Sequence, residues 1–543
     1  MATRLKQILG NVPGAAVFYD ALRPRRPRTR YNLEQLAAHL PRAVAETRPF
    51  AARRPTGKNL VLFATLHYWI EQAAIVGLAL RGMGHNVTIA YLPYGNWEHE
   101  INKFDLRRQD LYTRRVLAPV KDLLDVISLR DFHTAGTLPR VLEEALKTAA
   151  QYDVMYSLQV EDVDPRTALY RLRMERNRLA CGAVLAYLHG KVPDAALIPN
   201  GLVTELGMFY QTARFLEVPT VTYEFNDQRE QIWLAHDLVV MQQNTDELWR
   251  ARGSVPLTES ERDQIRSFEE ARQGAMVYGK GTRLWQDLPS RGSESLRTSL
   301  GLDDRPVVLL ATNVLGDSLT LGRNLFASSM AEWMERTVAY FVERPDVQLV
   351  VRVHPGERLI KGPSMMRVIE RAAPGKPEHI HVVGATDNTN TYDIMELADL
   401  GLVYTTTVGM EMAMRRVPVI VGGRTHYRER GFTMDPSTWD EYFGMLDSQL
   451  RYPARHGLSA QQVEAAWNYA YRFFFEYPFD FPWRLMHFWR DMQEWPLGRV
   501  LSGEGRAAFG RTFDYLAGEN IEWGGSQPTS EAGNRGSGRL QAA

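Results

Sequence analysis

The residues best suited to chemistry begin with a histidine at the end of a buried strand. The stretch 350–357 reads Val-Val-Arg-Val-His-Pro-Gly-Glu, so an apolar run stops at His354 and Pro355. An imidazole there could donate a hydrogen bond to a phosphate or stabilise a leaving oxygen. The alternative is a strand-end histidine that only satisfies its neighbours. Arg352 lies on the same side of the strand and could support His354 in donor binding or form a core ion pair.

A second polar cluster follows about fifty residues later, where another apolar run ends in three threonines. Thr405, Thr406 and Thr407 end a predicted strand and open a predicted helix, so their hydroxyls and backbone N–H groups could hold a phosphate. Gly409 would allow close backbone approach, and Glu411 could accept ribose hydroxyls. The alternative is N-capping of the helix by threonine, with Glu411 as a first-turn partner of the helix dipole.

A third strand end lies upstream of both. The run 306–312 ends at Thr312 and is followed by Asn313, Gly316 and Asp317. Thr312 and Asn313 are candidates for donor binding at this turn. Asp317 could bind the ligand or cap the following segment.

The first half of the chain offers candidates for an acceptor site and a catalytic carboxylate. His67 and Glu71 follow the predicted strand 59–65 and could contact an acceptor. Glycosyl transfer needs a base or a nucleophile, and three carboxylates near strand ends could serve beside His354. These are Glu205, Glu224 and Asp227. For each of the three, a structural role is the alternative.

The elements that must position these residues alternate between strand and helix, which is typical of parallel α/β sheets. We predict two such lobes with a helical, aromatic C-terminal segment. The predicted divisions are a basic irregular lead-in with one short helix (1–57), a Rossmann-like acceptor lobe (58–252), a linker (253–304), a Rossmann-like nucleotide-sugar lobe (305–458), C-terminal helices that pack back on the lobes (459–523) and a disordered tail (524–543).

The segment from Arg305 to Phe432 resembles the capsule-polysaccharide biosynthesis glycosyltransferases. The resemblance rests on four motifs in order: the His-Pro strand end, the threonine turn before Glu411, Pro418-Val419-Ile420, and the loop from Gly422 to Tyr427. Gln159-Val160-Glu161 also resembles a Gln-x-Glu element of some retaining Kdo transferases. The resemblance implies a GT-B fold, with two lobes facing a cleft, and a nucleotide-sugar donor, with CMP-Kdo as the first expectation.

Composition limits the remaining classes. Lys plus Arg and Asp plus Glu both number 64 among 543 residues, so a general nucleic-acid-binding surface is not expected. One cysteine, Cys181, excludes an intramolecular disulfide and fits a cytoplasmic protein. The basic stretch Arg23 to Arg30 is either a solvated arm or a peripheral contact with an anionic membrane.

Metal motifs are not apparent. The sequence has no H-E-x-x-H and no cysteine pair, and Asp162-Val163-Asp164 lies outside the segment with the resemblance. We therefore predict a metal-independent glycosyltransferase that needs no cofactor beyond its nucleotide-sugar co-substrate. Its acceptor would be a surface polysaccharide or glycolipid. The alternatives are a sugar-nucleotide epimerase, a polyol-phosphate transferase, or a non-catalytic subunit of a polysaccharide assembly complex.

Overall fold

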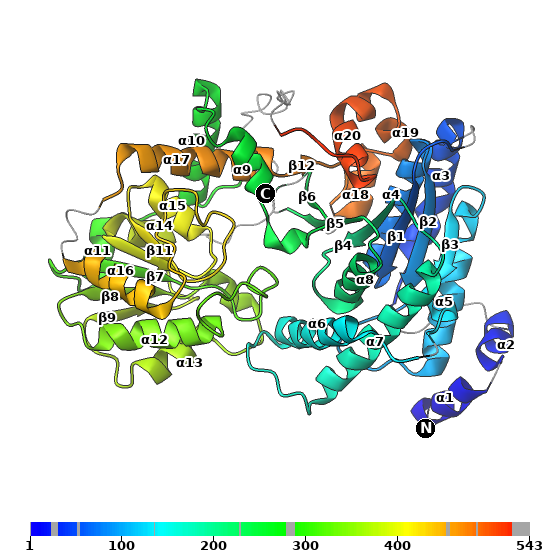
Figure 1. The fold of residues 1–543 in the computed structure, drawn as a ribbon, viewed down its shortest axis with the longest axis horizontal. Helices are drawn as coiled ribbons and strands as arrows, with labels where there is room; N and C mark the ends of the chain where they lie inside the picture. The colour runs from blue at the N-terminus through cyan, green and yellow to red at the C-terminus, as the bar shows by residue number, and fades with distance from the viewer. Residues whose placement is uncertain are drawn as a thin grey trace, which may run out of the picture.

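Two α/β lobes make up the protein (Figure 1). The computed structural model describes residues 2–12, 14–22, 31–51, 55–134, 136–226, 228, 230–278, 288–451, 457–484 and 487–523. Each lobe has its own sheet, with helices packed against it, as the predicted GT-B fold class requires.

The first lobe has a seven-stranded sheet in the order β12-β6-β5-β4-β1-β2-β3. Its strands are β1 (Asn59–Thr65), β2 (Asn86–Leu92), β3 (Asp125–Ser128), β4 (Ala195–Pro199), β5 (Thr220–Phe225), β6 (Gln231–His236) and β12 (Phe479–Asp480). Strands β1 to β5 are parallel, while β6 runs antiparallel to β5 and β12 antiparallel to β6. The central β1 is buried on both faces after its first residue, which explains its unbroken apolar run.

The helices of the first lobe cover this sheet. They are α4 (His67–Gly82), α5 (Lys103–Val116), α6 (Arg140–Leu158), α7 (Ala168–Leu188) and α8 (Thr204–Phe215). Helix α4 is buried along nearly its whole length, and Gly77 lets it lie against Leu62, Val87 and Leu124.

The second lobe has a five-stranded, fully parallel sheet in the order β11-β10-β7-β8-β9. Its strands are β7 (Val307–Ala311), β8 (Gln348–Arg352), β9 (Ile380–Val383), β10 (Leu400–Val403) and β11 (Val419–Val421). Its helices are α12 (Met330–Val342), α13 (Met365–Ala372), α14 (Thr391–Leu397), α15 (Val408–Met414) and α16 (Trp439–Arg451). Strands β7, β8 and β10 lie in the apolar runs where the sequence predicts strands.

The stretch predicted as a linker contributes to the core of the second lobe. It contains α10 (Glu259–Gln273) and α11 (Ser293–Leu300), and follows α9 (Asp246–Arg252). Ile265 and Phe268 of α10 belong to the same buried cluster as β7 and α15. A capping box between Thr258 and Glu261 starts α10.

The N-terminal stretch contains the predicted short helix, as α3 (Glu34–Ala51), and two further helices that were not predicted, α1 (Ala2–Asn11) and α2 (Ala15–Leu22). Helix α3 buries Leu36, Leu40 and Val44, which share one helical face, and packs against α4. The basic stretch Arg23 to Arg30 and the tail from residue 524 lie outside the described residues.

The C-terminal segment contacts both lobes (Figure 1). Its helices are α17 (Ala460–Tyr471), α18 (Phe488–Glu494), α19 (Leu497–Val500) and α20 (Gly503–Leu516). Tyr469 and Phe473 join the core of the second lobe, whereas Trp483, Phe488 and Phe513 join the core of the first. Within the described ranges, no helix has both the length and the apolar composition needed to cross a membrane.

Candidate functional site

The C-terminal edge of the second sheet brings together three strand ends predicted from the sequence. The strands β10, β7 and β8 are neighbours in the sheet. The backbone N–H of His354 donates to Oγ1 of Thr312 over 2.9 Å. The backbone N–H of Thr405 donates to Oδ1 of Asn313 over 3.2 Å. The turn after β7 therefore holds the two motifs on either side of it.

The imidazole of His354 has a defined orientation. Its Nδ1 accepts the backbone N–H of Gly356 over 3.0 Å, in the turn that Pro355 begins. An accepting Nδ1 places the proton of a neutral ring on Nε2. Half-buried His354 can thus present a hydrogen-bond donor at the sheet edge.

The three threonine hydroxyls differ in what they contact. Oγ1 of Thr405 is buried and has no hydrogen-bond partner among the residues that the structure describes. Oγ1 of Thr406 accepts the N–H of Val408 over 3.4 Å, and Thr407 donates to Glu411 over 3.2 Å. Thr405 is therefore the hydroxyl best placed to bind a ligand, and Thr407 makes no side-chain cap of α15.

Glu411 lies inside the second lobe and only 1% of it is exposed. Its carboxylate accepts hydrogen bonds from Arg272 over 2.8 Å and from the hydroxyl of Tyr392 over 2.7 Å. Burial opposes ionisation, but Arg272 and Tyr392 hold the pKa of Glu411 below its ordinary value. The prediction that Glu411 accepts ribose hydroxyls does not fit this geometry, because protein donors occupy both oxygens.

Gly409 makes room for protein atoms. A Cβ at this position would lie 2.4 Å from the hydroxyl oxygen of Tyr427 and 2.8 Å from Cγ2 of Val403. That hydroxyl donates to the carbonyl oxygen of Thr406 over 2.6 Å. The glycine thus lets Tyr427 brace the threonine turn from behind.

Two further donor-site candidates already bind protein groups. The guanidinium of Arg352 donates to the carbonyl oxygens of Gly384 and Thr389 over 2.6 and 3.2 Å, and burial lowers its pKa to about 10. These two hydrogen bonds go to backbone carbonyl oxygens, and not to His354 or to a carboxylate, which were the predicted contacts. Asp317 accepts the N–H of Leu319 over 2.9 Å, which is the capping alternative.

In the first lobe, Glu205 is fully buried. It forms an ion pair of 2.9 Å with Arg173, which also pairs over 2.9 Å with Asp153. All three side chains have 0% exposure. Asp153 also accepts the backbone N–H of Thr204 at the start of α8. Glu205 is therefore closed to a substrate in this structure and acts as part of a buried ion cluster.

Glu224 occupies a different environment at the end of β5. Its Oε2 accepts from Nδ2 of Asn200 over 2.9 Å, and its Oε1 accepts from the N–H of Phe225 over 3.0 Å. The residue is half-buried, and burial raises its pKa despite these two hydrogen bonds. The third carboxylate candidate, Asp227, lies outside the described residues.

The two acceptor-site candidates, His67 and Glu71, lie in different environments. His67 is half-buried at the start of α4, next to the ring of Tyr68, and burial lowers its pKa. Glu71 is one helical turn further, and its Oε2 accepts from the indole N–H of Trp489 over 3.3 Å. Burial raises the pKa of Glu71 to about 7. Glu71 thus faces the C-terminal segment, which argues against the predicted acceptor contact.

The end of α6 links the site edges of the two lobes. Asp153 binds the loop after β4 in the first lobe. Just beyond the helix, Glu161 accepts the N–H groups of Met330 and Ala331 at the start of α12, over 3.0 and 2.7 Å. The loop after β7 also packs here, because Gly316 lies against the carbonyl oxygen of Met155. The C-terminal end of α6 therefore contacts loops that follow strands in both lobes.

Two residues of this site have only weak signals in the sequence. Asn200 precedes a glycine, a turn signal that marks the position but not its contact with Glu224. Arg272 lies far from Glu411 in the chain and gives no signal of their ion pair.

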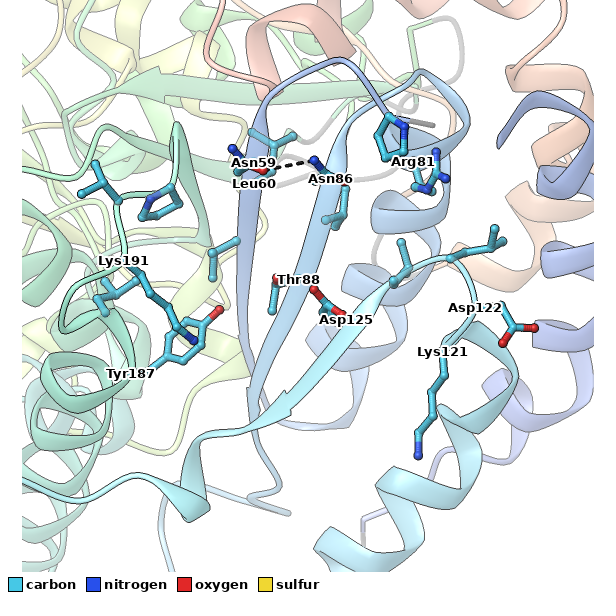
Figure 2. A pocket seen from close by; sticks show the side chains of 18 residues that line it. Asn59, Leu60, Arg81, Asn86, Thr88, Lys121, Asp122, Asp125, Tyr187 and Lys191 are labelled. Atoms are coloured by element: carbon cyan, nitrogen blue, oxygen red, sulfur yellow. Dashed lines mark hydrogen bonds between the residues drawn. The ribbon is translucent and has the colours of Figure 1, made fainter. Parts of the chain in front are cut away.

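A separate cavity of about 440 Å³ lies at the other end of the first sheet (Figure 2). Asn59, Asn86 and Asp125, at the starts of β1, β2 and β3, help to line it. It is therefore distinct from the strand ends that carry the candidate site. In the part of the chain that the structure describes, no three His, Cys, Asp or Glu side chains group as a metal site would require.

Comparisons with known proteins bear on the second lobe. Residues 277–443 match the family model described as "Capsule polysaccharide biosynthesis protein". A comparison with curated protein sequences gave no match.

Among solved structures, the chain is similar to Thermosulfurimonas dismutans KpsC, described as a beta Kdo 2,4 transferase. The identity is 17% and the TM-score 0.34, over 50% of this chain and 78% of that one. It is also similar to UDP-GlcNAc 2-epimerase from Neisseria meningitidis, with 10% identity and a TM-score of 0.25, over 77% and 98% of the two chains. The family match confirms the predicted resemblance: over residues 277–443, the chain has the sequence pattern of the capsule polysaccharide biosynthesis proteins.

Proposed function

We propose that this protein is a glycosyltransferase that moves a sugar from a nucleotide donor to a surface polysaccharide or glycolipid. The observation that carries the proposal is the joined edge of the second sheet. There, His354 and Thr405 bind adjacent residues of one turn, Thr312 and Asn313. The segment that matches the capsule family contains all four residues.

These groups suit a sugar nucleotide because both can donate to phosphate oxygens. Nε2 of His354 and the hydroxyl of Thr405 would hold the phosphate next to the bond that breaks. Negative charge grows on that phosphate as the sugar leaves, and fixed donors stabilise it most at that point. CMP-Kdo is the first donor to test, because the predicted resemblance includes Kdo transferases.

The experiment is a titration of the protein with CMP, CDP, UDP and GDP. We expect one nucleotide to bind, and Thr405→Val and His354→Ala to weaken its binding about tenfold each, the loss of a single charge-assisted hydrogen bond. Thr298→Val, on the exposed face of α11, should bind as the wild type does. If both site variants bind the nucleotide as tightly as the wild type does, the proposed donor site is contradicted.

A further inference from the structure

One carboxylate of the first lobe combines access with an unusual environment. Glu205 is fully buried against Arg173, whereas Glu224 is half-buried at the C-terminal end of β5. Ligands of open α/β sheets bind at such strand ends. Of the two carboxylate candidates that the structure describes, only Glu224 can meet a substrate without rearrangement of a buried ion pair.

A specialised turn orients this carboxylate. Asn200 follows β4, the strand next to β5, and has a φ of 57°, in the left-handed region. Its Oδ1 accepts the N–H groups of Leu202 and Val203 over 3.1 and 3.2 Å. Its Nδ2 then has a fixed direction and donates to Oε2 of Glu224 over 2.9 Å. Asparagine tolerates this backbone conformation better than most residues and supplies both an acceptor and a donor.

The same turn is held from its other end. The N–H of Thr204 donates to the buried carboxylate of Asp153, and Asp153 is paired with Arg173. The turn is therefore anchored at both ends, and Glu224 receives its hydrogen bond from a rigid support.

Among the described residues, aromatic side chains surround Glu224. Tyr223 precedes it on β5, Tyr68 approaches from α4, and Trp233 of β6 pairs with it across the sheet. Burial raises the pKa of both tyrosines, so they stay neutral at ordinary pH. His67, beside Tyr68, has a lowered pKa and is neutral as well.

Aromatic rings also flank the carboxylate. Phe225 is half-buried and stacks on Trp69, with 5.9 Å between ring centroids. Tyr68 is half-buried next to them. Aromatic faces suit the C–H surfaces of sugars, and such partly exposed rings beside a carboxylate fit a hydroxyl-bearing acceptor.

We propose that Glu224 is the base that receives the proton of the acceptor hydroxyl, and that Asn200 is the residue that positions it. This inference rests on the proposed function. In the transfer, the acceptor oxygen forms its bond to the anomeric carbon of the sugar and its proton moves to Glu224. The bond from that carbon to the nucleotide phosphate breaks, and its electron pair leaves with the phosphate.

The test compares Glu224→Gln with Asn200→Asp and Asn200→Gly, using the transfer of sugar from a nucleotide donor. Glu224→Gln should lower kcat by about 100-fold or more, the usual effect of losing general base catalysis, with donor affinity unchanged. Glu217→Gln, on an exposed turn of the same lobe, should keep wild-type activity. Activity of Glu224→Gln within threefold of wild type would overturn the assignment of the base.

The Asn200 variants test positioning through the pH profile of kcat/KM. Asn200→Asp replaces a donor by a like charge, which raises the pKa of Glu224 and moves the acid limb upward by about one pH unit. Asn200→Gly keeps the left-handed backbone and removes only the amide, so its limb should move in the same direction by less. If the acid limb of the kcat/KM profile stays at its wild-type pH in both variants, the proposed role of Asn200 is overturned.

The outcomes separate this inference from the proposed function. If wild-type protein transfers no sugar from any nucleotide donor, the proposed function and the inference that rests on it both fail. If wild-type protein transfers sugar while Glu224→Gln matches it, only the inference fails.

Discussion

Asp153 and Glu161 lie near the same end of α6, yet their carboxylates bind backbone N–H groups of different lobes. Asp153 binds Thr204 in the first lobe, and Glu161 binds Met330 and Ala331 in the second. Each bond ends at a helix start next to a site loop, so this short stretch contacts both lobes close to the candidate site.

Close packing at this junction makes Gly316 sensitive. Its φ is 66°, and a Cβ would lie 2.3 Å from the carbonyl oxygen of Met155 in α6. We expect Gly316→Ala to separate the lobes, raise the radius of gyration in solution scattering, and lower transfer activity about tenfold or more, since about 1 Å of misplacement can reduce catalysis strongly.

The matched control for this change is Gly301→Ala. Its φ is 67°, and no atom lies within 4 Å of the added Cβ. It should cost about 1 kcal/mol of stability from backbone strain alone and leave the scattering curve unchanged. Identical scattering curves for both variants would show that α6 does not position the second lobe.

The buried cluster in the first lobe predicts a large effect for Arg173→Met. The change leaves Asp153 and Glu205 buried without their cation, so we expect a loss of about 3–5 kcal/mol in the free energy of unfolding. Arg178→Met, on the same helix, removes only a partly exposed pair with Glu143 and should cost at most about 1 kcal/mol. Urea unfolding of the two variants measures this difference, and equal losses would contradict the account.

Glu71 predicts a pH-dependent stability. Its pKa rises from 4.5 in the unfolded chain to about 7 in the folded protein. Between these pH values the folded state binds more protons, so stability falls as pH rises through this window, by about 3 kcal/mol in all.

Glu71→Gln should therefore stabilise the protein at pH 8 by about 2–3 kcal/mol and have little effect at pH 4.5. Thermal unfolding at the two pH values measures the effect. Glu270→Gln, at an exposed position of α10, serves as the control. A stabilisation that is equal at both pH values would contradict a raised pKa at Glu71.

Metal removal gives a further prediction. We expect transfer activity to persist in the presence of EDTA, because His354 and the hydroxyl of Thr405 can bind the leaving phosphate directly. A loss of activity that returns on adding Mg²⁺ or Mn²⁺ would contradict the metal-independent proposal.

The sequence predicts the second sheet well because its strands are short apolar runs with sharp ends. The sequence predicts that β8 stops at the His-Pro pair and β10 at the threonines. The structure ends these strands at Arg352 and Val403, just before those positions. The missed strands carry weaker signals. Strand β3 has only four residues, and β12 has only two.

Contacts between distant parts of the chain could not be predicted from apolar runs or from the residues that end them. A glutamate one step after a threonine turn has the same local pattern whether it meets a ribose or a buried arginine. Only the fold brings Arg272 to Glu411. Glu71 likewise lies in the first turns of the helix after a strand end, but the fold brings Trp489 of the C-terminal segment against it.

The most direct test of the central claim follows both sugar and nucleotide in one reaction. The protein is mixed with CMP-Kdo and other sugar nucleotides, with and without a glycan acceptor, and the products are identified by mass. We predict an acceptor heavier by one sugar, with an equal amount of released nucleotide, and no isomerised donor when the acceptor is left out. An isomerised sugar nucleotide formed without any acceptor would contradict the account and indicate an epimerase.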